Sequence, residues 1–158
     1  MSEAVIKDYL NSHARLEQAI EGLDDARLTW KAAASSWSIT EVLGHLADHS
    51  IVVSFRIRAV LAGSTERLPA FSQDEWVESQ RSNEASAAEI LAFFHSQLRY
   101  NGQLLHRLAP HEWEKNGINA QGDSVRITDI VRGFAAHVDR HLGQIDRIKA
   151  AQAEASRS

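Results

Sequence analysis

Apolar residues recur at intervals of three and four along most of the 158-residue chain, which is the helical period. The first such stretch runs from Ser2 to Gly22, and the glycine is a candidate C-terminal cap. The second begins at Ser38, because Ser38-Ile39-Thr40-Glu41 has the pattern of a capping box, and it continues to Gly63. The pattern therefore predicts two long helices in the first half of the chain.

The second half repeats this arrangement. A further box, Ser86-Ala87-Ala88-Glu89, begins a helix that Pro110 must end. The last periodic stretch begins near Thr128, a candidate N-cap, with Asp129 favourably placed at the positive end of the helix dipole. Four helices with one apolar face each predict an all-α four-helix bundle, with residues 1–150 as a single domain and 151–158 as a frayed tail.

Two connections are unusually long for a bundle. Residues 63–85 and 110–127 exceed the usual helix-to-helix loop of about 2 to 8 residues. We therefore expect each connection to cross the bundle or to cover one of its ends, anchored by Trp76 and Trp113. Residues 124–127 are compatible with a short extended segment before the last helix.

Charge and composition exclude several classes of protein. The formal net charge of -4 and a pI near 6.0 disfavour a nucleic-acid-binding surface. The chain has no cysteine, which excludes disulfides, thiolate metal sites and cysteine nucleophiles. The start of the chain lacks the basic flank and apolar run of a signal peptide, and no segment approaches the roughly 20 apolar residues of a membrane span. We therefore expect a cytoplasmic protein that contacts no membrane.

Four of the eight histidines lie on helix faces that the pattern directs inward. His137 and His141 belong to the apolar stripe of the last helix, and His45 and His49 to that of the second. Histidines four residues apart have Cβ atoms roughly 5 to 6 Å apart and can converge on one ion. A third imidazole from a facing helix would leave one position open for water or substrate, as in catalytic zinc sites; nickel or cobalt would also accept this ligand set. The alternative is a group of neutral core histidines that are hydrogen-bonded to their neighbours.

Two segments resemble a known family. They are WSITEVLGHLAD at residues 37–48 and AHVDRHLGQI at residues 136–145. Together they resemble the DinB/YfiT-like superfamily of bacterial metal-binding proteins, and the resemblance extends over nearly the whole chain. It implies a four-helix bundle of up-down-down-up order, a homodimer, and one divalent metal ion, most commonly zinc or nickel.

The resemblance also assigns roles to individual residues. It implies that the metal ligands are His45, His137 and His141. His49 is then a residue of the second shell or of the pocket wall. Apart from the resemblance, Arg56 has two interpretations, as a surface charge or as a contact for an anionic substrate at the pocket mouth. Asp48 and Asp139 have two interpretations, as carboxylates that orient the imidazoles or as solvated charges on the helix surface.

The function implied by this site has three forms. A metal-bound water would give a hydrolase, and a metal-bound low-molecular-weight thiol, such as bacillithiol, mycothiol or glutathione, would give an S-transferase acting on a small-molecule electrophile. Some members of the family are thiol S-transferases and maleylpyruvate isomerases. The third form is a stress-associated metal-binding or scaffold homodimer that catalyses nothing. The catalytic residues and the substrate do not follow from the chain, because the predicted loops contain no motif.

Overall fold

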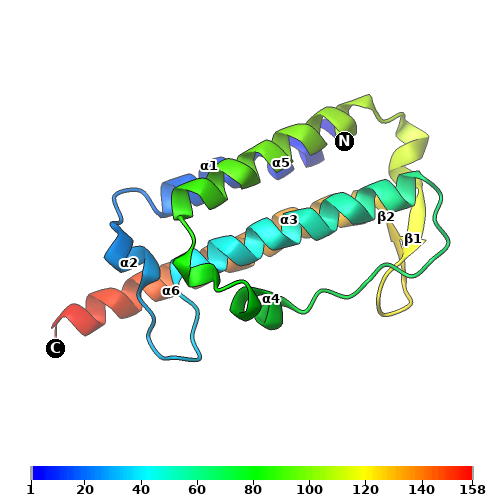
Figure 1. Ribbon diagram of the computed structural model, residues 1–158. Helices are drawn as coiled ribbons and strands as arrows, with labels where there is room; N and C mark the ends of the chain where they lie inside the picture. Colours follow the sequence, from blue (N-terminus) through cyan, green and yellow to red (C-terminus); the bar gives the residue numbers. More distant parts are fainter. Residues whose placement is uncertain (1, 158) are drawn as a thin grey trace.

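Four long helices form the body of the computed structural model, which describes residues 2–157 (Figure 1). They are α1 (Ser2–Ala19), α3 (Ile39–Leu61), α5 (Ala87–Arg107) and α6 (Ile127–Arg157). Helices α1 and α3 each pack against both α5 and α6, so the four helices close into a ring. The predicted all-α four-helix bundle is confirmed.

The directions of the helices explain the first long connection. In Figure 1, α3 and α5 run from the end that carries the short helix α2 (Asp25–Thr29) towards the end that carries the hairpin of β1 (Asn116–Ile118) and β2 (Ser124–Arg126), whereas α1 and α6 run the opposite way. Because the neighbours α3 and α5 are parallel, the chain must return along the bundle between them. A short loop cannot do this, so residues 62–86 form an extended connection along the outside of the bundle.

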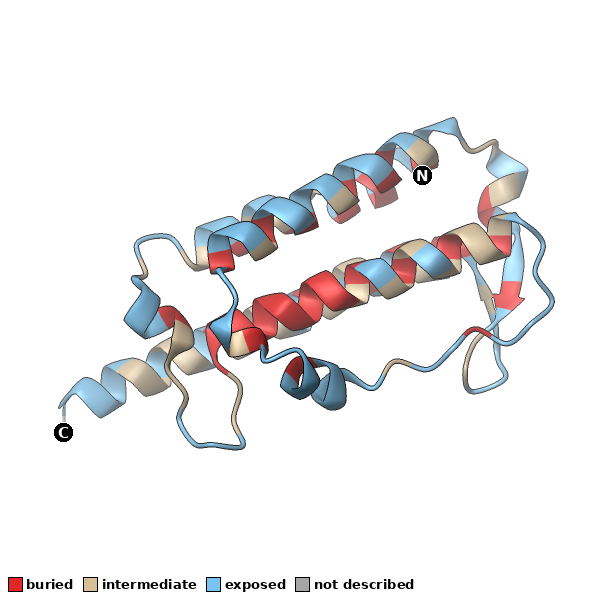
Figure 2. Ribbon diagram, viewed as in Figure 1, coloured by how far each residue is buried: buried red, intermediate tan, exposed pale blue. Residues whose placement is uncertain are grey.

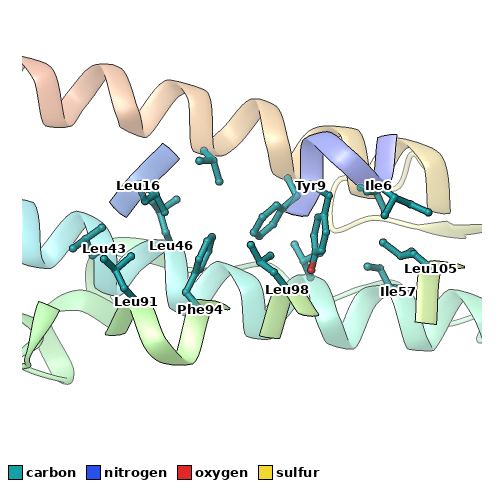
Figure 3. Close-up of a cluster of buried hydrophobic side chains, with 14 of the residues drawn as sticks. Ile6, Tyr9, Leu16, Leu43, Leu46, Ile57, Leu91, Phe94, Leu98 and Leu105 are labelled. Atoms are coloured by element: carbon teal, nitrogen blue, oxygen red, sulfur yellow. The ribbon is translucent and has the colours of Figure 1, made fainter. Parts of the chain in front are cut away.

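The core lies along the axis of the bundle. Large side chains from all four helices are fully buried there, and Figure 3 shows Tyr9, Leu16, Leu46, Phe94 and Leu98 among them. Burial of each such side chain contributes roughly 1.5 to 3 kcal/mol. The first half of α3 is buried on nearly every side, as the continuous red stretch in Figure 2 shows. Polar residues in this half of α3 are therefore removed from bulk water.

The start of α3 has the predicted cap. The Ser38 hydroxyl accepts a hydrogen bond from the Glu41 amide at 3.0 Å, and the Glu41 carboxylate accepts one from the Ser38 amide at 2.9 Å. Both halves of the capping box are thus confirmed. At α5, the Ser86 hydroxyl accepts from the Glu89 amide at 3.3 Å, which confirms Ser86 as the N-cap.

The first helix is shorter than predicted. Helix α1 ends at Ala19, and Gly22 lies beyond it in a turn with φ +80°, a conformation that favours glycine. A short helix that the pattern did not predict, α2 (Asp25–Thr29), follows. The Asp24 side chain caps it by accepting from the Arg27 amide at 3.0 Å.

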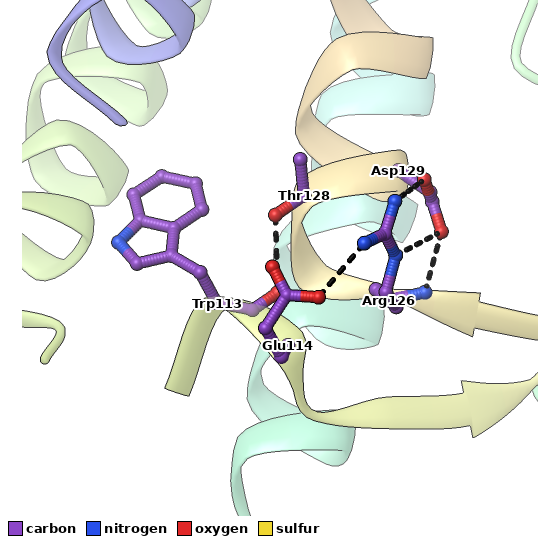
Figure 4. Close-up of polar contacts among 5 residues, drawn as sticks. All are labelled: Trp113, Glu114, Arg126, Thr128 and Asp129. Carbon is purple, nitrogen blue, oxygen red and sulfur yellow. Dashed lines mark hydrogen bonds and ion pairs between the residues drawn. The ribbon is translucent and has the colours of Figure 1, made fainter. Parts of the chain in front are cut away.

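The prediction of Thr128 as the N-cap of the last helix is wrong. Helix α6 begins at Ile127, and Thr128 is buried with its hydroxyl donating to the Trp113 carbonyl at 3.1 Å (Figure 4). Asp129 instead caps the helix, because its carboxylate accepts from the Arg126 amide at 3.0 Å. It also holds the Arg126 guanidinium, which in turn bonds to Glu114 at 2.7 Å.

The last helix extends to Arg157. Two side chains in its last third are bonded to residues of α1 and α2. The Lys149 ammonium donates to the Ala19 carbonyl at 3.0 Å, and the Gln152 amide donates to the Arg27 carbonyl at 2.5 Å. Fraying of the tail from 151 stays a prediction.

The two long connections contain short elements of their own. The first contains α4 (Gln73–Ser79) and the 3₁₀ helix η1 (Ser82–Glu84), and the second contains the 3₁₀ helix η2 (Pro110–Glu114) and strands β1 (Asn116–Ile118) and β2 (Ser124–Arg126). The strands pair antiparallel, which confirms the short extended segment before α6.

The predicted anchors of these connections differ. Trp113 is buried at 6% exposure, as predicted, whereas Trp76 is 37% exposed, with its ring centroid 4.9 Å from that of Phe71 and the two planes at 86°. Leu68 and Val77, and not Trp76, are the buried hydrophobic residues of the first connection. Among residues 2–157, no helix combines the length and the apolar character needed to cross a membrane.

Candidate metal centre

Three histidine side chains from two facing helices meet at one point inside the bundle. His45 comes from α3, and His137 and His141 come from successive turns of α6. The His137 Nε2 atom lies 3.1 Å from Nε2 of His45 and 3.1 Å from Nε2 of His141. Within residues 2–157 this is the only group of three or more histidine and acidic side chains whose ligand atoms all lie within 4.8 Å of one another. The structure thus brings together the three histidines that the family resemblance implies as ligands.

Burial keeps these imidazoles neutral. Desolvation is the main cause that lowers the pKa of His45 and of His137 to about 3, and the neighbouring histidines lower both further. The pKa of His141 is also lowered by burial, although its hydrogen bond to Gln144 opposes this shift. All three rings are therefore neutral at pH 7, which is the form that offers a lone pair to a metal ion.

Gln144 fixes the tautomer of His141. Its Oε1 lies 2.8 Å from His141 Nδ1, and a carboxamide oxygen only accepts hydrogen bonds. The proton therefore sits on Nδ1, and the Nε2 lone pair faces the other two histidines. Sequence reasoning missed Gln144, although its position three residues after His141 on one helix face was an available signal.

The donor set fits a small divalent cation. Two imidazole nitrogens bound to one zinc ion at about 2.0 to 2.1 Å in tetrahedral geometry lie roughly 3.3 Å apart, close to the observed 3.1 Å contacts. The Nδ1 atoms of His45 and His137 are buried and have no hydrogen-bond partner in the described chain. Three neutral rings with converging nitrogens and few alternative partners match a ligand set better than a hydrogen-bonded core cluster.

His49 lies beside this group and outside it. Its ring centroid is 4.0 Å from that of His137, and its ring stacks on Phe134 at 5.5 Å. Burial is the largest cause that lowers the His49 pKa to about 3, followed by the charges of its neighbours. Its Nε2 does not join the converging nitrogens, and the ring forms part of a pocket wall.

Neither Asp48 nor Asp139 is hydrogen-bonded to an imidazole. Asp48 accepts from the Gln80 amide at 2.9 Å, and Asp139 pairs with Arg15 at the surface. The interpretation of these carboxylates as groups that orient the histidines is therefore wrong. Asp139 is an exposed charge as the other interpretation stated, whereas Asp48 is only 7% exposed and burial raises its pKa.

Two pockets of similar size flank the histidines along α6. The arginine pocket, of about 450 Å³, lies towards the start of α6, and its wall includes His49, Arg56, Phe71, Phe134, His137 and Arg140. The tryptophan pocket, of about 460 Å³, lies towards the end of α6, and its wall includes Trp30, Trp37, Asp74, His141, Gln144 and Arg147. Each pocket therefore reaches one of the α6 histidines.

Aromatic rings close the space around His45. Phe71, from the connection between α3 and α4, stacks on the His45 ring at 5.5 Å and 5°. Trp37 lies 5.2 Å from the same ring and 6.3 Å from that of His141. Sequence reasoning missed Phe71, because nothing local in a loop indicates that it returns to a helix 26 positions away. Together these rings form an aromatic wall beside His45.

A family model matches most of the chain. The model of the DinB superfamily covers residues 9–145, so the chain belongs to this superfamily. A candidate metal-dependent hydrolase of Oceanobacillus iheyensis is 22% identical over 142 residues, which are 89% of this chain and 79% of that protein. YfiT of Bacillus subtilis, also named as a candidate metal-dependent hydrolase, is 21% identical over 85% of this chain and 76% of its own.

Solved structures show the same fold. The structure of YfiT from Bacillus subtilis, described as an unusual four-helix bundle, superposes with a TM-score of 0.87 at 19% identity, over 96% of this chain and 87% of that one. A mycothiol-dependent maleylpyruvate isomerase superposes with a TM-score of 0.71 at 11% identity, over 92% of this chain and 60% of that one. At these identities the superpositions establish the fold.

Proposed function

We propose that this protein is a divalent-metal-dependent enzyme whose ion is bound by the Nε2 atoms of His45, His137 and His141. The observation that carries this proposal is the convergence of three neutral imidazole nitrogens from two facing helices. The names of the hydrolase relatives in the same superfamily support it. Zinc and nickel are the ions that we expect first, since both accept three imidazoles.

Hydrolysis of a small-molecule substrate is the activity that we place first. A divalent ion in such a site acts as a Lewis acid and lowers the pKa of a group at its open position. The chain itself contributes three neutral ligands, the Gln144 oxygen that orients His141, and the Phe71 and Trp37 rings that pack against His45.

Transfer of a low-molecular-weight thiol to an electrophile is the second candidate. Two pockets of nearly equal volume reach different histidines, which provides separate room for a thiol and for a second substrate. The mycothiol dependence of the isomerase with the same fold supports this candidate. A hydrolase needs room for only one organic substrate, so occupancy of both pockets would favour the transferase.

A metal-binding or scaffold homodimer without catalysis is the alternative that the experiments must separate from an enzyme. The homodimer stays a prediction from the resemblance, and the cytoplasmic location stays a prediction from the composition and the start of the chain. Turnover discriminates between the two. A hydrolase would cleave esters or amides without an added thiol, and a transferase would convert a generic electrophile only when a thiol is added. We expect one of these activities in the metal-loaded protein and its loss in His45→Ala.

The direct test of the site is elemental analysis of the tag-free protein. We expect one divalent ion per chain in the wild type and none in His137→Ala. His95→Ala is the matched control, because His95 is an exposed histidine on α5 outside the group. Equal metal content in wild type and His137→Ala would overturn the ligand assignment. Full metal content with no turnover across ester, amide and thiol-dependent panels would favour the scaffold.

A further inference from the structure

Arg56 presents a guanidinium group that the protein satisfies only in part. The residue lies on α3, 11 positions after His45, and forms part of the wall of the arginine pocket. Its Nη2 donates to the Pro69 carbonyl at 3.0 Å, which fixes the side chain against the first long connection. Its Nε is buried and has no hydrogen-bond partner. Arginine remains protonated in proteins, so a charged donor is left without an acceptor.

The surroundings provide no counter-ion. Among the described residues, neither Arg56 nor Arg140 forms an ion pair, although both belong to the wall of this pocket. The carboxylate in the same wall, Asp129, is already engaged by Arg126 through two guanidinium hydrogen bonds. The pocket therefore has two uncompensated positive charges. Arg140 is exposed to water, whereas Arg56 is half-buried, so an anionic ligand would offset the cost of burying the unpaired charge of Arg56.

The remainder of the wall is largely apolar. Phe71 and Phe134 enclose the interior, together with the aliphatic residues Val53, Leu68 and Ile130. The volume of about 450 Å³ is within the range of small-molecule sites, roughly 300 to 1,000 Å³. The wall of the pocket thus combines two positive charges with apolar side chains, and it includes His137.

We propose that the arginine pocket binds a small carboxylate with an apolar body, and that Arg56 is its principal recognition residue. The guanidinium fork suits a carboxylate, because two parallel N–H donors match its two oxygens. Arg140 adds positive charge from α6. This inference extends the proposed function. It rests on that function in one respect, namely that the bound carboxylate is the substrate, with its apolar part held beside the metal centre.

Binding of benzoate, with benzamide as its neutral analogue, tests this site. We would titrate both probes into protein that has been stripped of metal and freed of chelator, and follow the amide resonances by NMR. Benzoate cannot then bind through the ion. Arg56→Gln removes the charge, and Arg147→Gln is the matched control, since Arg147 belongs to the tryptophan pocket. The dispersion of the amide spectrum shows whether each variant folds.

We expect wild type to bind benzoate at least about tenfold more tightly than benzamide. We also expect benzoate to bind wild type about tenfold more tightly than Arg56→Gln, because a charge-assisted hydrogen bond has this strength. Arg147→Gln should bind like wild type. Arg56→Lys, which keeps the charge and loses the fork, should be intermediate, and it decides the matter if Arg56→Gln does not fold. Equal affinity for the two probes, or equal weakening in Arg56→Gln and Arg147→Gln, would overturn the proposal. The elemental analysis above fails or succeeds independently, because this titration uses no metal.

Discussion

The protein brings histidines together in two places, with different results. His13 of α1 and His95 of α5 stack face to face, with ring centroids 4.1 Å apart and planes 11° apart. In the group of His45, His137 and His141, the ring centroids lie at similar distances of 4.5 to 4.9 Å, but the rings meet edge to face at 63° to 74°. The first pair lies at the surface of the bundle, and the second group lies between α3 and α6.

The angle between the rings determines what each group can bind. Imidazole lone pairs lie in the plane of the ring, so stacked rings direct their nitrogens in parallel directions and do not converge on a point. Rings that meet edge to face direct their nitrogens towards a common centre, as the 3.1 Å contacts of His137 Nε2 show. The number of neighbouring histidines is thus a weaker indicator of a metal site than the convergence of their nitrogens.

The largest expected effect that separates the two groups is on stability in the presence of metal. With free metal at 1,000 times its dissociation constant, binding stabilises the folded state by about 4.1 kcal/mol. We expect a chelator to remove this stabilisation from wild type and from His95→Ala, and to leave His137→Ala unchanged. Thermal unfolding with and without chelator measures it. A chelator effect of equal size in His137→Ala would contradict the assignment.

The second effect is the acid sensitivity of the metal-free protein. The pKa of His45, His49 and His137 is about 3 in the folded state against 6.5 for the free side chain, so below pH 6.5 the unfolded chain binds protons that the folded chain does not. Stability is therefore present above pH 6.5 and is lost as the pH falls towards 3. Each histidine contributes at most roughly 2 kcal/mol of this loss between pH 6.5 and 5.

His49→Phe removes one of these three titrating histidines, so it tests the contribution of His49 to the acid sensitivity. Phenylalanine keeps the aromatic stack between Phe71 and Phe134 and has no group that titrates. We expect urea unfolding of His49→Phe to lose less stability than wild type between pH 6.5 and 5, with the two proteins compared from a common reference at pH 7.5. Parallel losses in the two proteins would show that His49 is protonated in the folded state.

A smaller effect tests the orientation of His141. Gln144→Ala removes the acceptor that holds the proton on Nδ1, and loss of such a partner commonly weakens metal binding about 10- to 100-fold. Gln97→Ala is the control, because Gln97 accepts a hydrogen bond from Ser54 on the far side of α3. Competition with a metal-sensitive dye measures both affinities. An unchanged affinity in Gln144→Ala would show that packing alone orients the ring.

The smallest effect concerns Asp139, an exposed carboxylate that is not bonded to the three histidines. Asp139→Asn breaks an exposed ion pair with Arg15, and such pairs contribute about 0 to 1 kcal/mol. We expect a slight change in unfolding free energy, reduced further by salt, and no change in metal affinity. A substantial loss of metal in Asp139→Asn would restore the interpretation that this carboxylate orients an imidazole.

Local features were predictable because their physical causes lie within a few residues. Ser38 and Ser86 cap α3 and α5, as the spacing of serine and glutamate indicates. Thr128 shows the limit of such rules, because its hydroxyl is taken by the Trp113 carbonyl and the adjacent Asp129 performs the capping. A local pattern shows which side chains are able to cap a helix, and tertiary packing selects among them.

The candidate metal site likewise has features that the local sequence determines and features that depend on tertiary packing. The amino-acid order alone determined that His45 and His49 share one helix face and that His137 and His141 share another, since helical periodicity is a local property. Only the tertiary structure decided that α3 faces α6 at the depth where His45 meets the α6 pair, that His49 stays in the pocket wall, and that Phe71 covers the group. These contacts join residues tens of positions apart through long connections, and their geometry depends on how all four helices pack into one core.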